Sequence, residues 1–132
     1  MTSRTVIVAA AVAERGDRIL VTQRPSGVHL EGFWEFPGGK CDEGESLAAC
    51  LARELREELD VGAQIGAEIF TTAHTYPDRR VELHFFRCEL LSEPRPQQGQ
   101  AMRWIRREEL ETLRFPPADE ELIRRLIDGG QA

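Results

Sequence analysis

The segment from Gly38 to Val61, GGKCDEGESLAACLARELREELDV, constrains this chain more than any other part of the sequence. Ser46 is of a residue type that caps helix N-termini, and leucines follow at positions 47, 51, 55 and 59. A four-residue repeat keeps these side chains on one side of a helix. The segment therefore predicts a helix from Ser46 to about Leu59 with a buried leucine stripe.

The same helix brings three carboxylates together. Glu54, Glu57 and Glu58 stand at positions i, i+3 and i+4, so they share one face within a single turn. Like charges at this spacing repel one another, whereas clustered hard oxygen ligands suit Mg²⁺. Arg53 precedes Glu57 by four residues and is placed to orient it. A solvated acidic helix face is the alternative interpretation of these residues taken alone.

The rest of the chain predicts strands and two shorter helices. Apolar and β-branched runs predict strands at residues 5–12, 18–23, 65–72, 81–91 and 101–105. Helices are expected at residues 108–113 and from about 118 to 127. We find no repeat or linker, so we expect one domain over residues 1–132. Strands mixed with two or three helices predict a layered α/β or α+β fold.

Composition narrows the class of function. The chain has 17 Lys and Arg against 23 Asp and Glu, a net charge of −6, which disfavours binding to a nucleic acid polymer. Neither a membrane-spanning apolar run nor a secretory signal is found. The three cysteines, Cys41, Cys50 and Cys88, are odd in number and lack CxxC spacing. We therefore expect no zinc site, no disulfide framework and a reducing cytoplasmic environment.

The complete spacing of the acidic segment resembles the signature of the Nudix hydrolases. Gly39 is followed after five residues by Glu45, and after seven more by the run Arg53 to Glu58. A solvated helix face does not account for this agreement. The family usually has glycine where Asp60 ends the helix, and Asp tolerates the left-handed conformation expected there. The resemblance implies a mixed β-sheet sandwiched between helices.

Four further segments resemble the MutT branch of that family, whose members sanitise nucleotide pools. They are residues 23–25 (QRP), 32–40 (GFWEFPGGK), 76–79 (YPDR) and 115–120 (FPPADE). The resemblance implies Mg²⁺-dependent hydrolysis of a nucleoside triphosphate to a monophosphate and pyrophosphate. It also implies a nucleotide as partner. We expect the protein to be a monomer or a homodimer.

The resemblance assigns roles residue by residue. Metal ions, Mg²⁺ or its substitute Mn²⁺, would be held by the Gly38 carbonyl and by Glu54, Glu57 and Glu58. The catalytic residues would be Glu45, Arg53, Glu54 and Glu57, with Glu54 positioning or deprotonating the attacking water. The residues expected to contact substrate are Arg24, Phe36, Arg79 and Asp119. For Arg79 an exposed solubilising role, and for Phe36 a place in the core, are the alternatives.

One position departs from the pattern of the branch. Gln98 stands where relatives often have a glutamate that contacts metal or water. A neutral amide coordinates Mg²⁺ more weakly than a carboxylate and does not act as a base. Glu93 would take over this role only if its loop folds back toward the helix.

Asp119 is expected to set the choice of base. Relatives that act on 8-oxo-dGTP typically have asparagine there, which both donates and accepts hydrogen bonds. An ionised carboxylate suits the amine of cytosine instead, and a branch that acts on CTP has Asp in this place. Burial would keep Asp119 protonated and restore a donor, while an N-cap is its ordinary structural role. We favour 8-oxo-dGTP, with CTP or 5-methyl-dCTP and a non-catalytic nucleotide-binding module as the alternatives.

Overall fold

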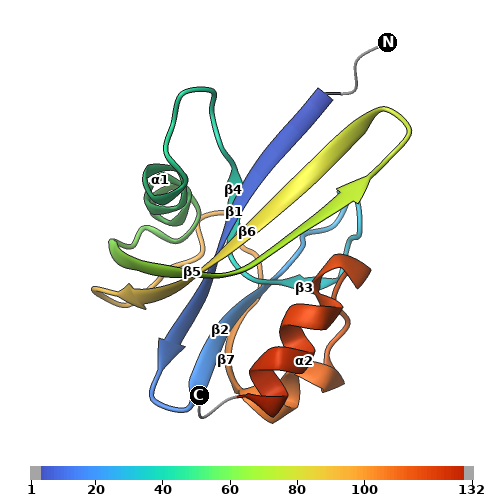
Figure 1. Cartoon of the computed structure of the whole chain (residues 1–132). Coiled ribbons are helices and arrows are strands. Elements are labelled where there is room, and N and C mark those ends of the chain that lie inside the picture. The colour runs from blue at the N-terminus through green and yellow to red at the C-terminus, as the bar shows by residue number, and fades with distance from the viewer. Residues whose placement is uncertain (1–3, 130–132) are drawn as a thin grey trace.

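A seven-stranded mixed β-sheet carries one α-helix on each face in the computed structural model, which describes residues 4–129 (Figure 1). The strands are β1 (Arg4–Arg15), β2 (Arg18–Gln23), β3 (Trp34–Glu35), β4 (Gly38–Lys40), β5 (Ala63–Thr75), β6 (Arg79–Leu90) and β7 (Met102–Arg106). The helices are α1 (Leu47–Leu59) and α2 (Glu120–Asp128), with two 3₁₀ turns, η1 (Arg107–Thr112) and η2 (Pro117–Asp119). Of the helices in residues 4–129, none has the length and apolar character to cross a membrane.

Strand β1 holds the sheet together. The strand order is β3-β2-β1-β6-β5, with β4 also paired to β1 and β7 to β2. β1 runs parallel to β6, from Arg4 opposite Arg79 to Ala13 opposite Cys88, and antiparallel to β2 and β4. The short β4 places Gly39 opposite Ala9. The loop that leads into α1 therefore starts at the centre of the sheet.

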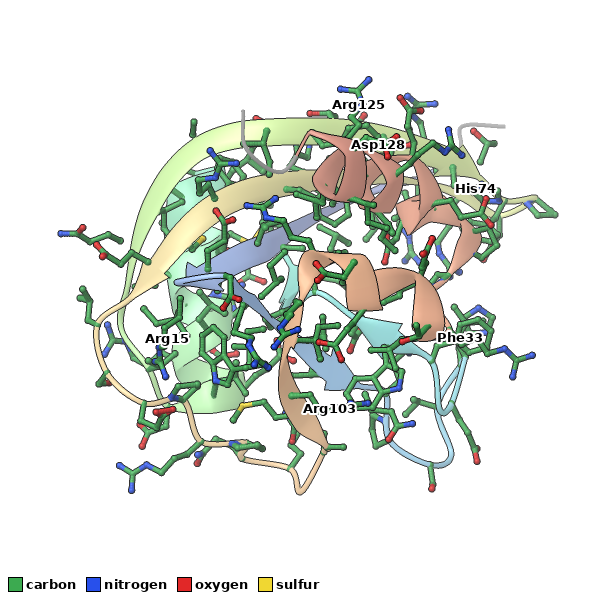
Figure 2. All side chains as sticks on the ribbon, turned by 90° about the horizontal axis from the view of Figure 1, so that it is seen from below. Arg15, Phe33, His74, Arg103, Arg125 and Asp128 are labelled. Atoms are coloured by element: carbon green, nitrogen blue, oxygen red, sulfur yellow. A yellow bond between two sulfur atoms is a disulfide. The ribbon has the colours of Figure 1, made fainter. Side chains whose placement is uncertain are left out.

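Both faces of β1 are buried under a helix. Ala9, Ala11 and Ala13 pack with the α1 leucines in one core cluster, whereas Ala10 and Val12 pack with residues of α2 in the other. Side chains fill the space between the sheet and each helix (Figure 2). The two faces of β1 therefore contribute to two separate cores, one under α1 and one under α2. The expected mixed sheet between helices is thus confirmed.

Helix α1 forms as its sequence predicts. The Ser46 hydroxyl accepts a hydrogen bond from the Ala49 amide at 3.1 Å, which caps the first turn. Leu51, Leu55 and Leu59 are fully buried. Asp60 ends the helix in the left-handed conformation with φ 51° and ψ 45°, so the position where relatives carry glycine does demand that conformation.

The C-terminal helices differ from expectation in type and start. The segment expected to be helical at residues 108–113 is the 3₁₀ turn η1, and the last α-helix begins at Glu120, after the 3₁₀ turn η2. Pro116 and Pro117 precede this helix and have no backbone N–H to donate. The chain therefore enters α2 through a tighter turn.

The expectation that no disulfide forms is wrong. Cys41 and Cys50 are joined, with their Cα atoms 5.2 Å apart, and Cys88 is free and buried. The chain leaves β4 at Lys40 and turns back into the first turn of α1, which brings two residues nine positions apart into contact. An odd count and the absence of CxxC spacing do not detect a proximity that the tertiary fold creates.

Candidate active site

Arg53 connects the loop after β4 with the acids of α1. Its guanidinium donates two hydrogen bonds to Glu45, from Nε at 2.7 Å and from Nη2 at 3.0 Å. Nη1 donates to Glu54 at 2.8 Å and to Glu57 at 3.2 Å, and Nη2 also donates to the Lys40 carbonyl at 3.0 Å. The hydrogen bonds from Arg53 and from the Asp42 amide lower the pKa of Glu45 to about 2. Glu45 is therefore ionised and fixed at neutral pH.

The carboxylate of Glu54 lies directly against the backbone of Gly39. A Cβ atom on Gly39 would come within 2.2 Å of Glu54 Oε1 and 2.4 Å of its Cδ, so a side chain there would displace the Glu54 carboxylate. Glycine at this position allows the carboxylate to lie against β4. The fixed spacing between Gly39 and Glu54 in the sequence thus has a steric cause.

Glu58 has a carboxyl oxygen without a hydrogen-bond partner. Its Oε2 atom is buried and accepts no hydrogen bond from any group in residues 4–129. Burial, followed by the nearby carboxylate of Glu54, raises the pKa of Glu58 to about 8. An acceptor that is buried, unsatisfied and crowded by another acid is stabilised by a bound cation.

The donor set fits a hard divalent cation. Glu54 and Glu58 offer carboxylate oxygens on one face of α1, and Glu57, whose side chain is 59% exposed, extends beside them toward Arg53. Within residues 4–129, however, no three acidic, histidine or cysteine side chains are already arranged as a metal site. Arg53 supplies the positive charge that holds Glu54 and Glu57 in this structure.

Asp119 is buried at the start of α2, with 5% of its surface exposed. Burial, and then the charge of Glu35, raise the pKa of Asp119 to about 7. It occupies the N-cap position of α2, but its side chain makes no capping hydrogen bond. Capping therefore does not explain this residue.

Glu35 is a site residue that sequence reasoning missed. It lies in β3 and accepts a hydrogen bond from Arg24 Nη1 at 3.0 Å. Its charge raises the pKa of both Asp119 and Glu58, so it acts on the start of α2 and on the acids of α1. The signal in the sequence was an acid alone among apolar residues in GFWEFPGG. Arg24, which also donates to the His29 carbonyl at 2.6 Å, is thereby brought to the site.

Phe36 and Arg79, which were predicted to contact substrate, pack against residues other than the acids of α1. Phe36 is a core residue that stacks on Phe115 at 5.4 Å and meets Phe85 edge-on at 5.9 Å. Arg79 begins β6 at the turn of the long β5–β6 hairpin, where it pairs with Arg4 at the start of β1 (Figure 1). Its guanidinium lies 5.1 Å from the centre of the Tyr76 ring and donates to Asp78.

The loop between β6 and β7 docks on the end of α1. The Gln97 amide donates to the Glu58 carbonyl at 2.9 Å, which places Gln98 beside the turn that carries the acids. Glu93 instead forms an ion pair with Arg15 at 3.1 Å, at the far end of β1. In this structure Glu93 thus pairs with Arg15 instead of with the acids of α1.

Comparison with known proteins agrees with this geometry. A NUDIX domain model matches residues 8–125. The chain is similar to the 8-oxo-dGTP diphosphatase of Haemophilus influenzae, with 34% identity over 92% of this chain and 90% of that protein. It is similar to the CTP pyrophosphohydrolase of Escherichia coli, with 34% identity over 91% of this chain and 90% of that protein.

Solved structures give the same result. The E. coli ORF135 protein superposes with a TM-score of 0.86 at 32% identity, over 98% of this chain and 96% of its own. The MutT protein of Methanosarcina mazei has a TM-score of 0.86 at 18% identity, over 100% and 99% of the two chains, which shows the shared fold. With the family match, the close relatives and the arrangement of Gly39, Arg53 and the α1 acids together, the chain belongs to the Nudix hydrolases.

Proposed function

We propose that this Nudix hydrolase cleaves a nucleoside triphosphate to a nucleoside monophosphate and pyrophosphate, and that 8-oxo-dGTP is its preferred substrate. The names of the relatives support hydrolysis of a nucleoside triphosphate. We also propose that residues 1–132 form one domain that works in the cytoplasm as a monomer or a homodimer. The family match over residues 8–125 supports the single domain.

Nudix hydrolases generally need a divalent metal ion. We propose Mg²⁺, with Mn²⁺ as a substitute, held by the Gly38 carbonyl and by Glu54, Glu57 and Glu58. When bound, such an ion neutralises phosphate charge and lowers the pKa of water. The unsatisfied, buried Oε2 of Glu58 supports this assignment.

The side chains around the acids hold and orient the reacting groups. Glu54, fixed between Gly39 and Arg53, is the group that we propose positions the attacking water and accepts its proton. Arg53 orients Glu54 and Glu57, while its two hydrogen bonds to Glu45 hold its own guanidinium in place. Arg24, held by Glu35, is our proposed phosphate contact, since its planar fork suits phosphate oxygens.

The burial of Asp119 is the observation that carries the choice of base. With a pKa raised to about 7, a substantial fraction of its carboxyl is protonated at neutral pH. A protonated carboxyl has both a donor and an acceptor, as an amide does. It therefore matches the N7–H and O6 groups of 8-oxoguanine.

The similarity to the CTP pyrophosphohydrolase of E. coli favours a second candidate. An ionised Asp119 would accept a hydrogen bond from the exocyclic amine of cytosine. The two candidates require opposite protonation states of one side chain. They therefore predict opposite pH dependences of substrate preference.

The test measures pyrophosphate release from 8-oxo-dGTP, dGTP, CTP and 5-methyl-dCTP with Mg²⁺ at pH 6 and pH 8. We expect the highest kcat/KM with 8-oxo-dGTP, and a ratio of 8-oxo-dGTP to CTP that falls as pH rises. A group whose ionisation changes kcat/KM equally for both substrates leaves this ratio unchanged. Asp119→Asn should make the ratio independent of pH, and Glu120→Gln, which changes an exposed neighbour, should leave its pH dependence intact. Preference for cytidine nucleotides would support the second candidate, and hydrolysis of none would support a binding module.

A further inference from the structure

The Cys41–Cys50 disulfide lies within the proposed active site. Cys41 directly follows β4, two residues after Gly39, and its amide donates to the Ile7 carbonyl of β1 at 2.8 Å. Cys50 lies in the first turn of α1, four residues before Glu54 and therefore on the same side of the helix. The bond thus joins the two elements whose contact is made by Gly39 and Glu54.

The disulfide also closes the loop that carries Glu45. Residues 42–49 lie between the two cysteines and include Glu45, which binds Arg53, and Ser46, which caps α1. Arg53 of α1 donates two hydrogen bonds to Glu45 of this loop. It donates two more to the acids of α1. The covalent bond and Arg53 therefore restrain the same interface independently. The disulfide is therefore one of two restraints on the position of the acids.

We propose that Cys41–Cys50 is a redox-modification site that controls the affinity of the α1 acids for a divalent cation. In the disulfide form, the loop and α1 are held at the spacing at which Glu54 contacts Gly39. In the dithiol form, this spacing relaxes and the cation is bound more weakly. The inference rests on the metal site proposed above, but it does not depend on which nucleotide is hydrolysed.

The reductant is a small or protein dithiol. One of its thiolates attacks Cys41 Sγ, because Cys41 is partly exposed whereas Cys50 is fully buried. The bond between the two protein sulfurs breaks, Cys50 leaves as a thiolate and takes up a proton, and a mixed disulfide forms on Cys41. The second thiol of the reductant then displaces Cys41. Two electrons and two protons have passed to the protein, and the reductant has become a cyclic disulfide.

The interior of the site accepts the reduced form. Cys50 Sγ lies 3.9 Å from the Gly39 carbonyl oxygen, a sulfur–oxygen distance at which a thiol can donate a hydrogen bond. The new thiol at Cys50 therefore has a hydrogen-bond acceptor close by in β4. Both states are compatible with the fold, as a reversible modification requires.

The test titrates the protein with Mn²⁺ alone, in its oxidised form after diamide treatment and in its reduced form after dithiothreitol, each reagent having been removed. Alkylation in denaturant should label one cysteine in the oxidised form and all three in the reduced form. We expect the Kd for Mn²⁺ to rise about 3- to 10-fold on reduction, a smaller loss than removal of an orienting side chain causes. The melting temperature should fall by about 5–10 °C, because the closed loop is short.

Two variants separate the disulfide from other effects of the reagents. The double variant Cys41→Ser/Cys50→Ser should bind Mn²⁺ as the reduced protein does and should not respond to either reagent. Cys88→Ser should retain the full response, because Cys88 lies outside the pair. Equal Kd values in both redox states, or three labelled cysteines after diamide, would overturn the redox proposal while leaving the metal site intact. Failure to bind Mn²⁺ in either state would overturn both.

Discussion

Replacing Asp119 by asparagine should stabilise the protein, and increasingly so as the pH rises. Asp119 is 5% exposed, and its pKa is raised from 3.8 to about 7 by burial and by the charge of Glu35. Between these two values the folded protein holds a proton that the unfolded chain has released. The free energy of unfolding therefore falls as pH rises through this window.

The size of the effect follows from the same two values. The rise from 3.8 to about 7 corresponds to a cost of about 4 kcal/mol once the pH exceeds the folded pKa. At pH 5 the pH is only slightly above the pKa of Asp119 in the unfolded chain, and burial of its carboxyl lowers the free energy of unfolding by about 1.5 kcal/mol. The neutral amide of the Asp119→Asn variant carries no such cost. The stability difference between Asp119→Asn and the wild type should therefore grow by about 2.5 kcal/mol from pH 5 to pH 8.

Urea denaturation followed by circular dichroism at pH 5, 6, 7 and 8 measures this difference. The control is Glu120→Gln, which removes an exposed carboxylate from the next position and should follow the wild type across the range. If the stabilities of Asp119→Asn and the wild type ran parallel from pH 5 to pH 8, the buried carboxyl would not be the titrating group. The assignment of a donor to Asp119 would then lose its basis as well.

Three further substitutions test the site and the core. Gly39→Ala would place a Cβ atom 2.2 Å from Glu54 Oε1, so the affinity for Mn²⁺ should fall about 10- to 100-fold. The circular dichroism spectrum should stay unchanged. An unaltered affinity would contradict the steric role of Gly39. Arg53→Lys keeps the charge but loses the planar fork, and kcat should fall about 10- to 100-fold; near wild-type turnover would show that charge alone suffices. Leu55→Ala, at a fully buried position, should lower the free energy of unfolding by about 2–5 kcal/mol. Leu91→Ala, at a 62% exposed position, should change it by less than about 0.5 kcal/mol. Similar losses in the two variants would contradict the burial argument.

Local signals in the sequence were sufficient for α1 and for the long strands. Ser46 fixes the start of the helix, Asp60 its end, and the leucine repeat its buried face. Strand β2 has the predicted bounds, whereas the long strands β1, β5 and β6 are present but differ from their predicted bounds by one to three residues at their ends. These features depend on residues close together in the chain, so propensity and periodicity describe them well.

Features made by distant residues were harder to predict. The pairing of β4 with β1, the Cys41–Cys50 bond and the effect of Glu35 on Asp119 arise only when the sheet has formed. The protonation of Asp119 also depends on burial by residues elsewhere in the chain. The sequence indicated that burial was decisive there, but only the fold supplies its extent.

The alanines of β1 lie between the core under α1 and the core under α2. One face of this strand lies under α1, which carries the acids, and the other lies under α2, which begins next to Asp119. A larger side chain at Ala9 or Ala11 would push one helix outward and change the separation between metal and base sites. Substitutions that change substrate choice should therefore occur in the loops at the sheet edge. The residues of β1 should stay unchanged.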